Sequence, residues 1–243
     1  MQIFFKTDVG LVRNSNQDAC RYGELSETCA YAVVCDGMGG ANGGNVASSE
    51  AVDEVSRIIA EKYRQDMSDE ELTEAMKQAV LSANSRVYNM SCETDSLRGM
   101  GTTVELAVIR DGKVQVVHAG DSRVYLVNDD KIEQVTTDHS LVQEMVERGQ
   151  LTQEEARVHP GRNYITRALG VESNLDVDCL SREFPKGSIL LMCTDGLTNY
   201  FDSNELLDII KGTPHSDVTE KLVSMAKERG GSDNITVAVI LAE

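Results

Sequence analysis

The segment Tyr31–Gly44 reads YAVVCDGMGGANGG, and the arrangement of the rest of the chain follows from it. Its first residues, Tyr31–Cys35, form a short apolar run rich in β-branched residues, which predicts a buried strand. The strand ends in Asp36, and a glycine-rich loop then leads to a helix predicted to start near Asn45. Because an isolated buried charge is costly, a carboxylate at the mouth of a buried strand either caps the turn or holds a cation.

Three further carboxylates stand at the ends of apolar runs. One run precedes Asp121, another precedes Asp195, and Asp233 comes shortly before the run Ile235–Ile240. With Asp36 they predict a single hub to which distant parts of the chain each contribute an acid. Oxygen ligands suit hard cations such as Mg²⁺ or Mn²⁺ rather than zinc.

Length and composition predict one domain, covering residues 1–243. The chain has 243 residues, of which 41% are hydrophobic, and it contains no linker, repeat or low-complexity run. Its apolar runs are too short to span a bilayer, and charged residues follow Met1–Phe5 at once, so we expect neither a membrane segment nor a secretory signal. Six cysteines at irregular spacing predict reduced thiols in a cytoplasmic protein.

The net charge of −17 restricts the partners of this protein. It argues against a nucleic-acid partner, because no basic stripe is present to displace phosphate counterions. It also repels phosphorylated substrates. A phosphate-handling site in this chain must therefore create its own positive charge from metals and a few arginines.

The order of the predicted elements favours an α+β fold with antiparallel sheets and helices packed outside, because strands and helices do not alternate. The polar segment 136–162 is the best candidate for a mobile flap, and two short helices are expected within it. The predicted elements are strands at 2–8, 19–22 and 28–35, a helix at 45–63, a second helix from 68 to beyond 90, a meander of strands at 101–135, strands at 174–180 and 188–193, helices at 204–211 and 217–229, and a strand at 235–241.

Short motifs recur along the chain in a specific order. They are Arg13–Asp18 (RNSNQD), Asp36–Gly40 (DGMGG), Gly101–Thr103 (GTT), Gly120–Arg123 (GDSR), Thr137–Ser140 (TDHS), Arg167–Gly170 (RALG), Cys193–Leu197 (CTDGL) and Gly231–Thr236 (GSDNIT). With this set, the chain resembles the metal-dependent serine/threonine protein phosphatases of the type 2C family in their compact bacterial form.

The resemblance implies a four-layer αββα sandwich, in which two antiparallel sheets pack face to face between outer helices. It also implies a site with two Mn²⁺ or Mg²⁺ ions and a weaker third one. The implied metal ligands are Asp36 (bridging), the Gly37 carbonyl (first ion), Asp195 and Asp233 (second ion), Asp18 (through water), and Asp121 with Asp195 (third ion). The candidate flap residues beside the site are Ser140, His159 and Arg162.

The implied reaction is hydrolysis of phosphoserine and phosphothreonine in proteins by a metal-activated water, without a phosphoenzyme. Arg13 matches the phosphate-binding arginine, and it acts together with Asp36, Asp195 and Asp233. One departure concerns Met38, which stands where many eukaryotic members carry a proton-donating histidine.

The donor of that proton is left open by the sequence. It is either a metal-bound water or a histidine from elsewhere, with His118, His139 and His159 as candidates that are also compatible with structural roles. Arg123, Arg162 and Arg167 are compatible with phosphopeptide binding and equally with surface or strand-supporting roles.

Other functions compete with this interpretation. One is a phosphatase-like regulatory module that binds a phosphoprotein without turnover, and another is a different metal hydrolase such as a nuclease or nucleotide phosphatase. Within the family, the substrate is either a product of a cognate serine/threonine kinase or a phosphorylated anti-sigma antagonist. We expect a monomer, since no predicted element has a surplus apolar face.

Overall fold

The computed structural model describes residues 1–242, with the backbone only at 40–42, and contains two antiparallel sheets. The first sheet has the strand order β1 (Gln2–Asp8), β11 (Ile235–Leu241), β10 (Ile189–Cys193), β7 (Arg123–Asn128) and β8 (Lys131–Gln134). The second has the order β2 (Asp18–Ser26), β3 (Cys29–Met38), β5 (Val104–Arg110), β6 (Lys113–Ala119) and β9 (Asp178–Glu183), and β4 (Gly101–Thr102) pairs with β3.

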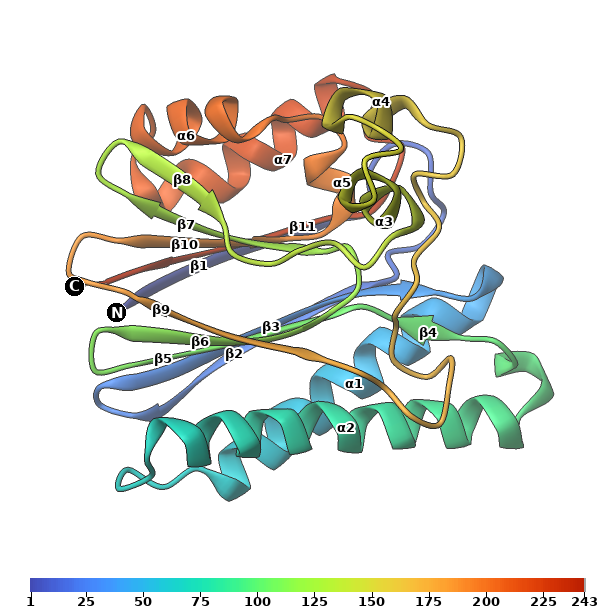
Figure 1. Ribbon diagram of the computed structural model, residues 1–243, viewed down its shortest axis with the longest axis horizontal. Helices are drawn as coiled ribbons and strands as arrows, with labels where there is room; N and C mark the ends of the chain where they lie inside the picture. The colour runs from blue at the N-terminus through green and yellow to red at the C-terminus, as the bar shows by residue number, and fades with distance from the viewer. Residues whose placement is uncertain (243) are drawn as a thin grey trace.

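Long helices cover the outer faces of these sheets, and short ones lie at one end of the sandwich (Figure 1). They are α1 (Gly40–Lys62), α2 (Asp69–Glu93), α3 (Leu141–Glu147), α4 (Gln153–Val158), α5 (Asp195–Thr198), α6 (Ser203–Lys211) and α7 (Val218–Glu228), with 3₁₀ turns at Asp95–Leu97 and His215–Asp217. Helices α1 and α2 lie on the second sheet, and α6 and α7 lie on the first. The predicted αββα sandwich is therefore confirmed.

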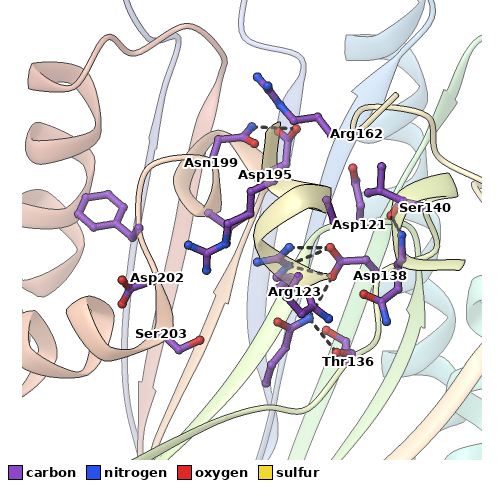
Figure 2. A pocket seen from close by; sticks show the side chains of 18 of the residues that line it. Asp121, Arg123, Thr136, Asp138, Ser140, Arg162, Asp195, Asn199, Asp202 and Ser203 are labelled. Atoms are coloured by element: carbon purple, nitrogen blue, oxygen red, sulfur yellow. Dashed lines mark hydrogen bonds and ion pairs between the residues drawn. The ribbon is translucent and has the colours of Figure 1, made fainter. Parts of the chain in front are cut away.

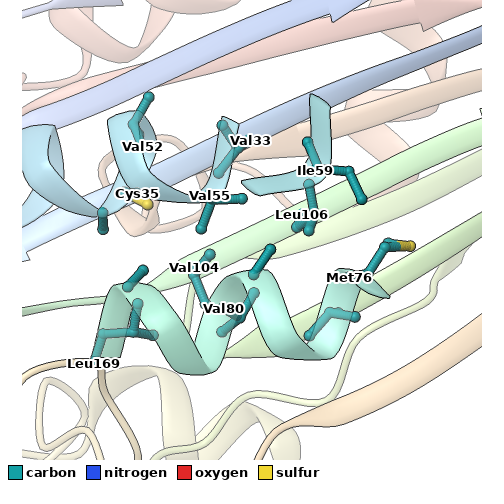
Figure 3. Close-up of a cluster of buried hydrophobic side chains, with 14 of the residues drawn as sticks. Val33, Cys35, Val52, Val55, Ile59, Met76, Val80, Val104, Leu106 and Leu169 are labelled. Atoms are coloured by element: carbon teal, nitrogen blue, oxygen red, sulfur yellow. The ribbon is translucent and has the colours of Figure 1, made fainter. Parts of the chain in front are cut away.

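Strand β3 is buried on both faces, as its apolar sequence predicts. Tyr31, Val33 and Cys35 belong to the core between the second sheet and the α1–α2 pair, which Figure 3 shows in close-up. Ala32 and Val34 point the other way, into the core between the two sheets. Alternating side chains of one strand thus contribute to two cores, because successive side chains in a strand point to opposite faces.

The helix predicted to start near Asn45 begins at Gly40 instead, so the predicted loop was too long. Strand β3 continues to Met38 by pairing with β4, and Gly39 makes the turn with a φ of 126°. Gly44 lies inside the helix because space requires it: a Cβ there would be 2.6 Å from the Gly37 carbonyl oxygen. Low helix propensity indicated a loop, and close packing overrides it.

The strand predicted at 174–180 starts later, at Asp178. Pairing with β6 begins only where Asp178 meets His118. Just before it, the Asn84 side chain of α2 donates hydrogen bonds to the carbonyls of Glu172 and Ser173, at 3.1 and 3.2 Å. Contact with the helix therefore holds the chain away from the sheet edge at this point.

The segment 136–162 leaves and re-enters the sandwich at one place. Ser140 forms an isolated bridge with Ile165, and its hydroxyl caps α3 by accepting from the Gln143 amide at 3.3 Å. Helix α4 starts with a reciprocal capping box between Thr152 and Glu155. Both short helices were predicted from these caps. In Figure 1 they lie beside α5, at the sheet ends where Asp36 and Asp195 also lie.

Candidate active site

Asp36 is held in place by its backbone at the end of β3. Its amide donates to the Thr103 hydroxyl at 2.9 Å, and its carbonyl accepts from the Thr103 amide and the Thr102 hydroxyl, both at 2.9 Å. The Gly101–Thr103 motif therefore fixes the point at which the Asp36 carboxylate leaves the strand.

Asp18 lies opposite Asp36 in the β2–β3 ladder. The Thr194 hydroxyl donates to Asp18 Oδ2 at 3.0 Å. Burial raises the pKa of Asp18 to about 7, although hydrogen bonds from Thr236 and Thr194 oppose the increase. The cause is the loss of hydration of the carboxylate, with repulsion from Asp195 added to it.

Asp121 and Asp195 complete a group of carboxylates that repel one another. Burial, followed by the charges of neighbouring acids, raises the pKa of Asp36 and of Asp121 well above the ordinary range. The pKa of Asp195 is also raised, first by burial and then by the charge of Asp233. The sequence predicted that these acids meet, and the structure brings them together.

Three oxygens of this group are buried and have no hydrogen-bond partner: Oδ1 of Asp18, of Asp121 and of Asp195. Orphaned buried carboxylate oxygens are costly unless a cation balances them, and an all-oxygen donor set fits Mg²⁺ or Mn²⁺. Among the described residues, no three acid, histidine or cysteine side chains already converge on one ion position. The fit therefore rests on the type and burial of the donor atoms, and not on a completed coordination shell.

Gly37 adds a backbone donor beside Asp36. The missing side chain of Gly44 leaves space in front of the Gly37 carbonyl oxygen, since a Cβ at Gly44 would lie 2.6 Å from that atom. Gly37 itself cannot carry a side chain, because its Cβ would lie 2.0 Å from the Gly44 carbonyl oxygen. The absence of side chains at Gly37 and Gly44 thus allows the two backbone segments to approach each other closely beside the Gly37 carbonyl.

Arg13 is joined to Asp233 across 220 residues of sequence. Its Nη2 donates to Asp233 Oδ2 at 2.8 Å, and its side chain is 52% exposed. The neighbouring Asn234 ties down the same loop: its Oδ1 accepts from the Gln17 amide at 2.8 Å, and its Nδ2 donates to the carbonyls of Val9 and Ser15, both at 3.0 Å. Contacts between residues 9–17 and residues 233–234 therefore hold Arg13 beside the acids.

A cavity of about 630 Å³ opens next to the acids (Figure 2). Asp121 and Asp195 form part of its wall, Ser140 and Arg162 come from segment 136–162, and residues 198–203 with Glu205 form another part. Of the candidate flap residues, Ser140 and Arg162 therefore line this cavity. His159 is not among its lining residues, and its Nδ1 accepts from the Gly161 amide at 3.0 Å.

The acids, Arg13 and the flanking cavity all lie in a part of the chain that matches a known protein family. The family model described as Protein phosphatase 2C matches residues 12–238. The chain belongs to the protein phosphatase 2C family. The predictions of family, fold and enzyme class, a protein phosphatase, are thereby confirmed.

Relatives of this phosphatase 2C chain align over almost their whole length. Protein phosphatase PhpP of Streptococcus pneumoniae is 37% identical over 241 residues, covering 99% of this chain and 97% of PhpP. The solved serine/threonine phosphatase of S. agalactiae is 33% identical, with a TM-score of 0.93 and coverage of 100% and 99%. The catalytic domain of the serine/threonine protein phosphatase PstP, solved in complex with two manganese ions, is 29% identical, with a TM-score of 0.86 and coverage of 100% and 98%.

The candidate proton donors of the phosphatase are mostly engaged elsewhere. His118 contacts Glu105 through Nδ1 and the Thr137 carbonyl through Nε2. His139 accepts from the Gly120 amide through Nδ1, and its Nε2 lies 3.3 Å from Asp178 Oδ2. With both ring nitrogens occupied, the two histidines are poorly placed to protonate a leaving group.

Two of the arginines singled out from the sequence of this phosphatase are also engaged. Arg123 grips Asp138 with Nε and Nη2 at 2.7–3.1 Å, as the dashed lines in Figure 2 show. Arg167 pairs with Asp178 at 3.0 Å. Their supporting roles are therefore favoured over direct phosphopeptide binding.

Several residues within the family motifs have supporting roles that the sequence alone did not indicate. Thr103 holds the Asp36 backbone, Thr194 holds the Asp18 carboxylate, and Asn234 holds the loop that carries Arg13. Each stands directly beside an acid or inside a quoted motif, and that position is the signal that could have identified it.

Proposed function

We propose that this protein hydrolyses phosphoserine and phosphothreonine in other proteins, in one step and without a phosphoenzyme, with Mn²⁺ or Mg²⁺ as cofactor. The main observation in support of this proposal is the cluster of buried carboxylates, in which three oxygens have no hydrogen-bond partner. The metal-dependence of the family and the manganese-bound PstP relative support the choice of cofactor.

Specific residues are assigned to the ions in this proposal. Asp36 would bridge two ions, the Gly37 carbonyl would serve the first, and Asp195 and Asp233 the second. Asp18 would act through an intervening water, and Asp121 would join Asp195 in a weaker third site. When bound, the ions supply Lewis acidity that activates a water and offset the negative charge of the phosphoryl group.

The side chains around the ions have their own tasks. Arg13 can present a planar, two-point donor set to phosphate oxygens. Its ion pair with Asp233 holds the guanidinium next to the acids and raises the pKa of Arg13 further, so its charge is constant. The Thr102–Thr103 backbone clamp keeps Asp36 at a fixed position. Substrate phosphate would therefore meet a positive group already in place, despite the negative charge of the whole chain.

The wider setting of the enzyme is also part of the proposal. Residues 1–243 form one catalytic domain with a flap at 136–162, and the protein is a cytoplasmic monomer that reverses the action of a cognate kinase. Six free cysteines support a reducing compartment. None of the described helices combines the length and apolar character needed to cross a bilayer.

The proposal is tested by hydrolysis of p-nitrophenyl phosphate and of a phosphothreonine peptide in EDTA, Mg²⁺ or Mn²⁺. Wild type should turn over only with metal, and Asp233→Ala should lose at least about 100-fold in kcat/KM, as expected for loss of a ligand and of the Arg13 anchor. Asp66→Ala, at an exposed site in a loop, should match wild type. If the protein binds the phosphopeptide but shows no turnover with any metal, it is a regulatory binding module and not an enzyme.

A further inference from the structure

Two arginines differ from all others in the part of the chain that the structure describes. Every other arginine forms an ion pair with a carboxylate. Arg157 of α4 and Arg162 of the following loop pair with none, and both line the 630 Å³ cavity. In a chain with 40 acidic and 23 basic residues, pairing is the default for an arginine. Both residues are exposed, so their charge is available to an anion that enters the cavity.

The acids of the same cavity do not supply that anion. Asp138 is gripped by Arg123, and Glu205 accepts from Arg229 at 2.8 Å. Asp202 caps α6, where its Oδ1 accepts from the Glu205 amide at 2.9 Å, and it forms no ion pair with an arginine of the described residues.

The two remaining acids of the wall, Asp121 and Asp195, are assigned to metal ions in the proposed function. The positive charge of Arg157 and Arg162 is thus left over for a ligand.

The rest of the wall suits a polar polypeptide. Eleven of its residues carry neutral hydrogen-bonding side chains: Gln134, Thr136, Thr137, Ser140, Gln143, Gln153, Asn163, Thr198, Asn199, Tyr200 and Ser203. The volume of about 630 Å³ lies within the range of roughly 300–1,000 Å³ that is typical of ligand pockets. That space exceeds what one phosphorylated side chain fills, so the flanking residues of a substrate can enter it.

We propose that this cavity is a second anion subsite, in which Arg157 and Arg162 bind a phosphate or carboxylate side chain carried by the same substrate segment as the phosphoresidue under hydrolysis. This inference rests on the proposed function and narrows the substrate class to phosphoprotein segments with two negative groups. Arginine is suited to this task because its planar guanidinium binds either oxyanion at two points.

The test is a positional scan of phosphothreonine peptides of equal length. Each peptide carries alanine, aspartate or a second phosphothreonine at one position within four residues of the scissile phosphate. With wild type and Mn²⁺, at least one anionic position should raise kcat/KM about tenfold over alanine, chiefly through KM. A tenfold effect corresponds to about 1.4 kcal/mol, which is within reach of one charge-assisted contact.

The variant Arg157→Gln/Arg162→Gln should abolish that preference. Arg148→Gln is the matched control, since Arg148 lies at the end of α3 in the same flap but pairs with Glu144, and it should keep the preference. Preference for phosphothreonine alone assigns the subsite to phosphate, and equal preference for aspartate assigns it to either oxyanion.

Two results separate the possible failures. Equal rates on all peptides, or a preference that survives in the double variant, would overturn the subsite while leaving the phosphatase intact. Absence of any turnover, including that of p-nitrophenyl phosphate, would instead reject the proposed function.

Discussion

Glu105 and His118 face each other across strands β5 and β6 and form an ion pair with no solvent exposure. His118 Nδ1 lies 2.8 Å from both carboxylate oxygens, and its Nε2 donates to the Thr137 carbonyl at 2.8 Å. Its ring stacks on that of His139, at 4.4 Å between centroids, and His139 accepts from the Gly120 amide. The pair therefore connects the strand end that leads into Asp121 with the start of the flap.

This pair predicts that stability falls as pH rises above neutrality. Burial alone would lower the pKa of His118, but the charge and hydrogen bonds of Glu105 outweigh it and raise the pKa from 6.5 to about 9. A raised histidine pKa contributes stability that is complete below pH 6.5 and is lost as pH rises through 9. Burial also raises the pKa of Glu105 from 4.5 to about 7. This carboxyl group therefore also makes stability fall as pH rises, but over the lower range between these two pKa values.

The measurement is urea unfolding between pH 6 and 9.5, with EDTA absent and Mn²⁺ constant. The free energy of unfolding of wild type should fall by on the order of 3 kcal/mol over this window, and His118→Gln should remove most of that slope. Glu105→Gln, which keeps a hydrogen-bonding partner, should also flatten it. His215→Gln, at an exposed site, should retain the slope. A flat wild-type profile would contradict the assignment.

A second prediction concerns Asn234, which joins the end of the chain to the loop that carries Arg13. Its side chain makes three hydrogen bonds of 2.8–3.0 Å to the backbone of Val9, Ser15 and Gln17. Asn234→Ala should lower the free energy of unfolding by roughly 3 kcal/mol, because each buried bond is worth about 1 kcal/mol.

Activity should suffer in the same variant, and kcat/KM should decrease more than stability alone explains, since Arg13 loses its fixed position. Asn204→Ala, on the exposed face of α6, is the control for stability and for turnover. Urea unfolding and peptide kinetics at a temperature where both variants are folded provide the readouts. An Asn234→Ala enzyme with wild-type kcat/KM would show that the loop is held by other contacts.

The sequence predicts strands well where one physical signal dominates. Gln2–Asp8 and Ile235–Leu241 were placed at their observed limits, because apolar and β-branched residues form bounded runs. It failed at Gly40–Gly44, where glycine content indicates a loop, although the chain is helical there and the close approach of Gly37 requires a glycine at position 44.

For the site residues, too, local sequence signals could be interpreted and long-range contacts could not. The acids could be identified from their places at strand ends, and the structure brings them together. Partners distant in sequence could not be identified, since nothing local marks the pairing of Arg13 with Asp233 or of Arg123 with Asp138. An unpaired arginine such as Arg157 is recognisable only after all the pairs are known.

The packing of Gly44 predicts an unusual sign for a helix substitution. Replacing glycine by alanine inside a helix normally stabilises it by up to about 1 kcal/mol. At Gly44 the new methyl group would lie 2.6 Å from the Gly37 carbonyl oxygen and 2.8 Å from the Gln17 side chain. Gly44→Ala should therefore destabilise the protein by about 1–3 kcal/mol, as overpacking does.

The same variant should weaken Mn²⁺ activation, because displacement of the Gly37 carbonyl moves a proposed metal donor. Ser49→Ala, at an exposed site of α1, controls for the addition of alanine to this helix. Thermal unfolding and the Mn²⁺ concentration for half-maximal activity are the measurements. A Gly44→Ala protein that is more stable than wild type would refute the close approach.

The buried carboxylates predict that metal stabilises the folded protein independently of turnover. Asp18, Asp36, Asp121 and Asp195 repel one another, so a cation that binds only the folded state should raise Tm in a saturable manner. At 100 times Kd the gain is about 2.7 kcal/mol, or roughly 5–10 °C for a chain of this size.

Asp36→Asn should unfold at a higher temperature than wild type in EDTA, since it removes one buried charge, and should gain little from Mn²⁺. Asp66→Asn, at an exposed site, should respond as wild type does. An equal Mn²⁺ response in Asp36→Asn and wild type would exclude Asp36 as a metal ligand.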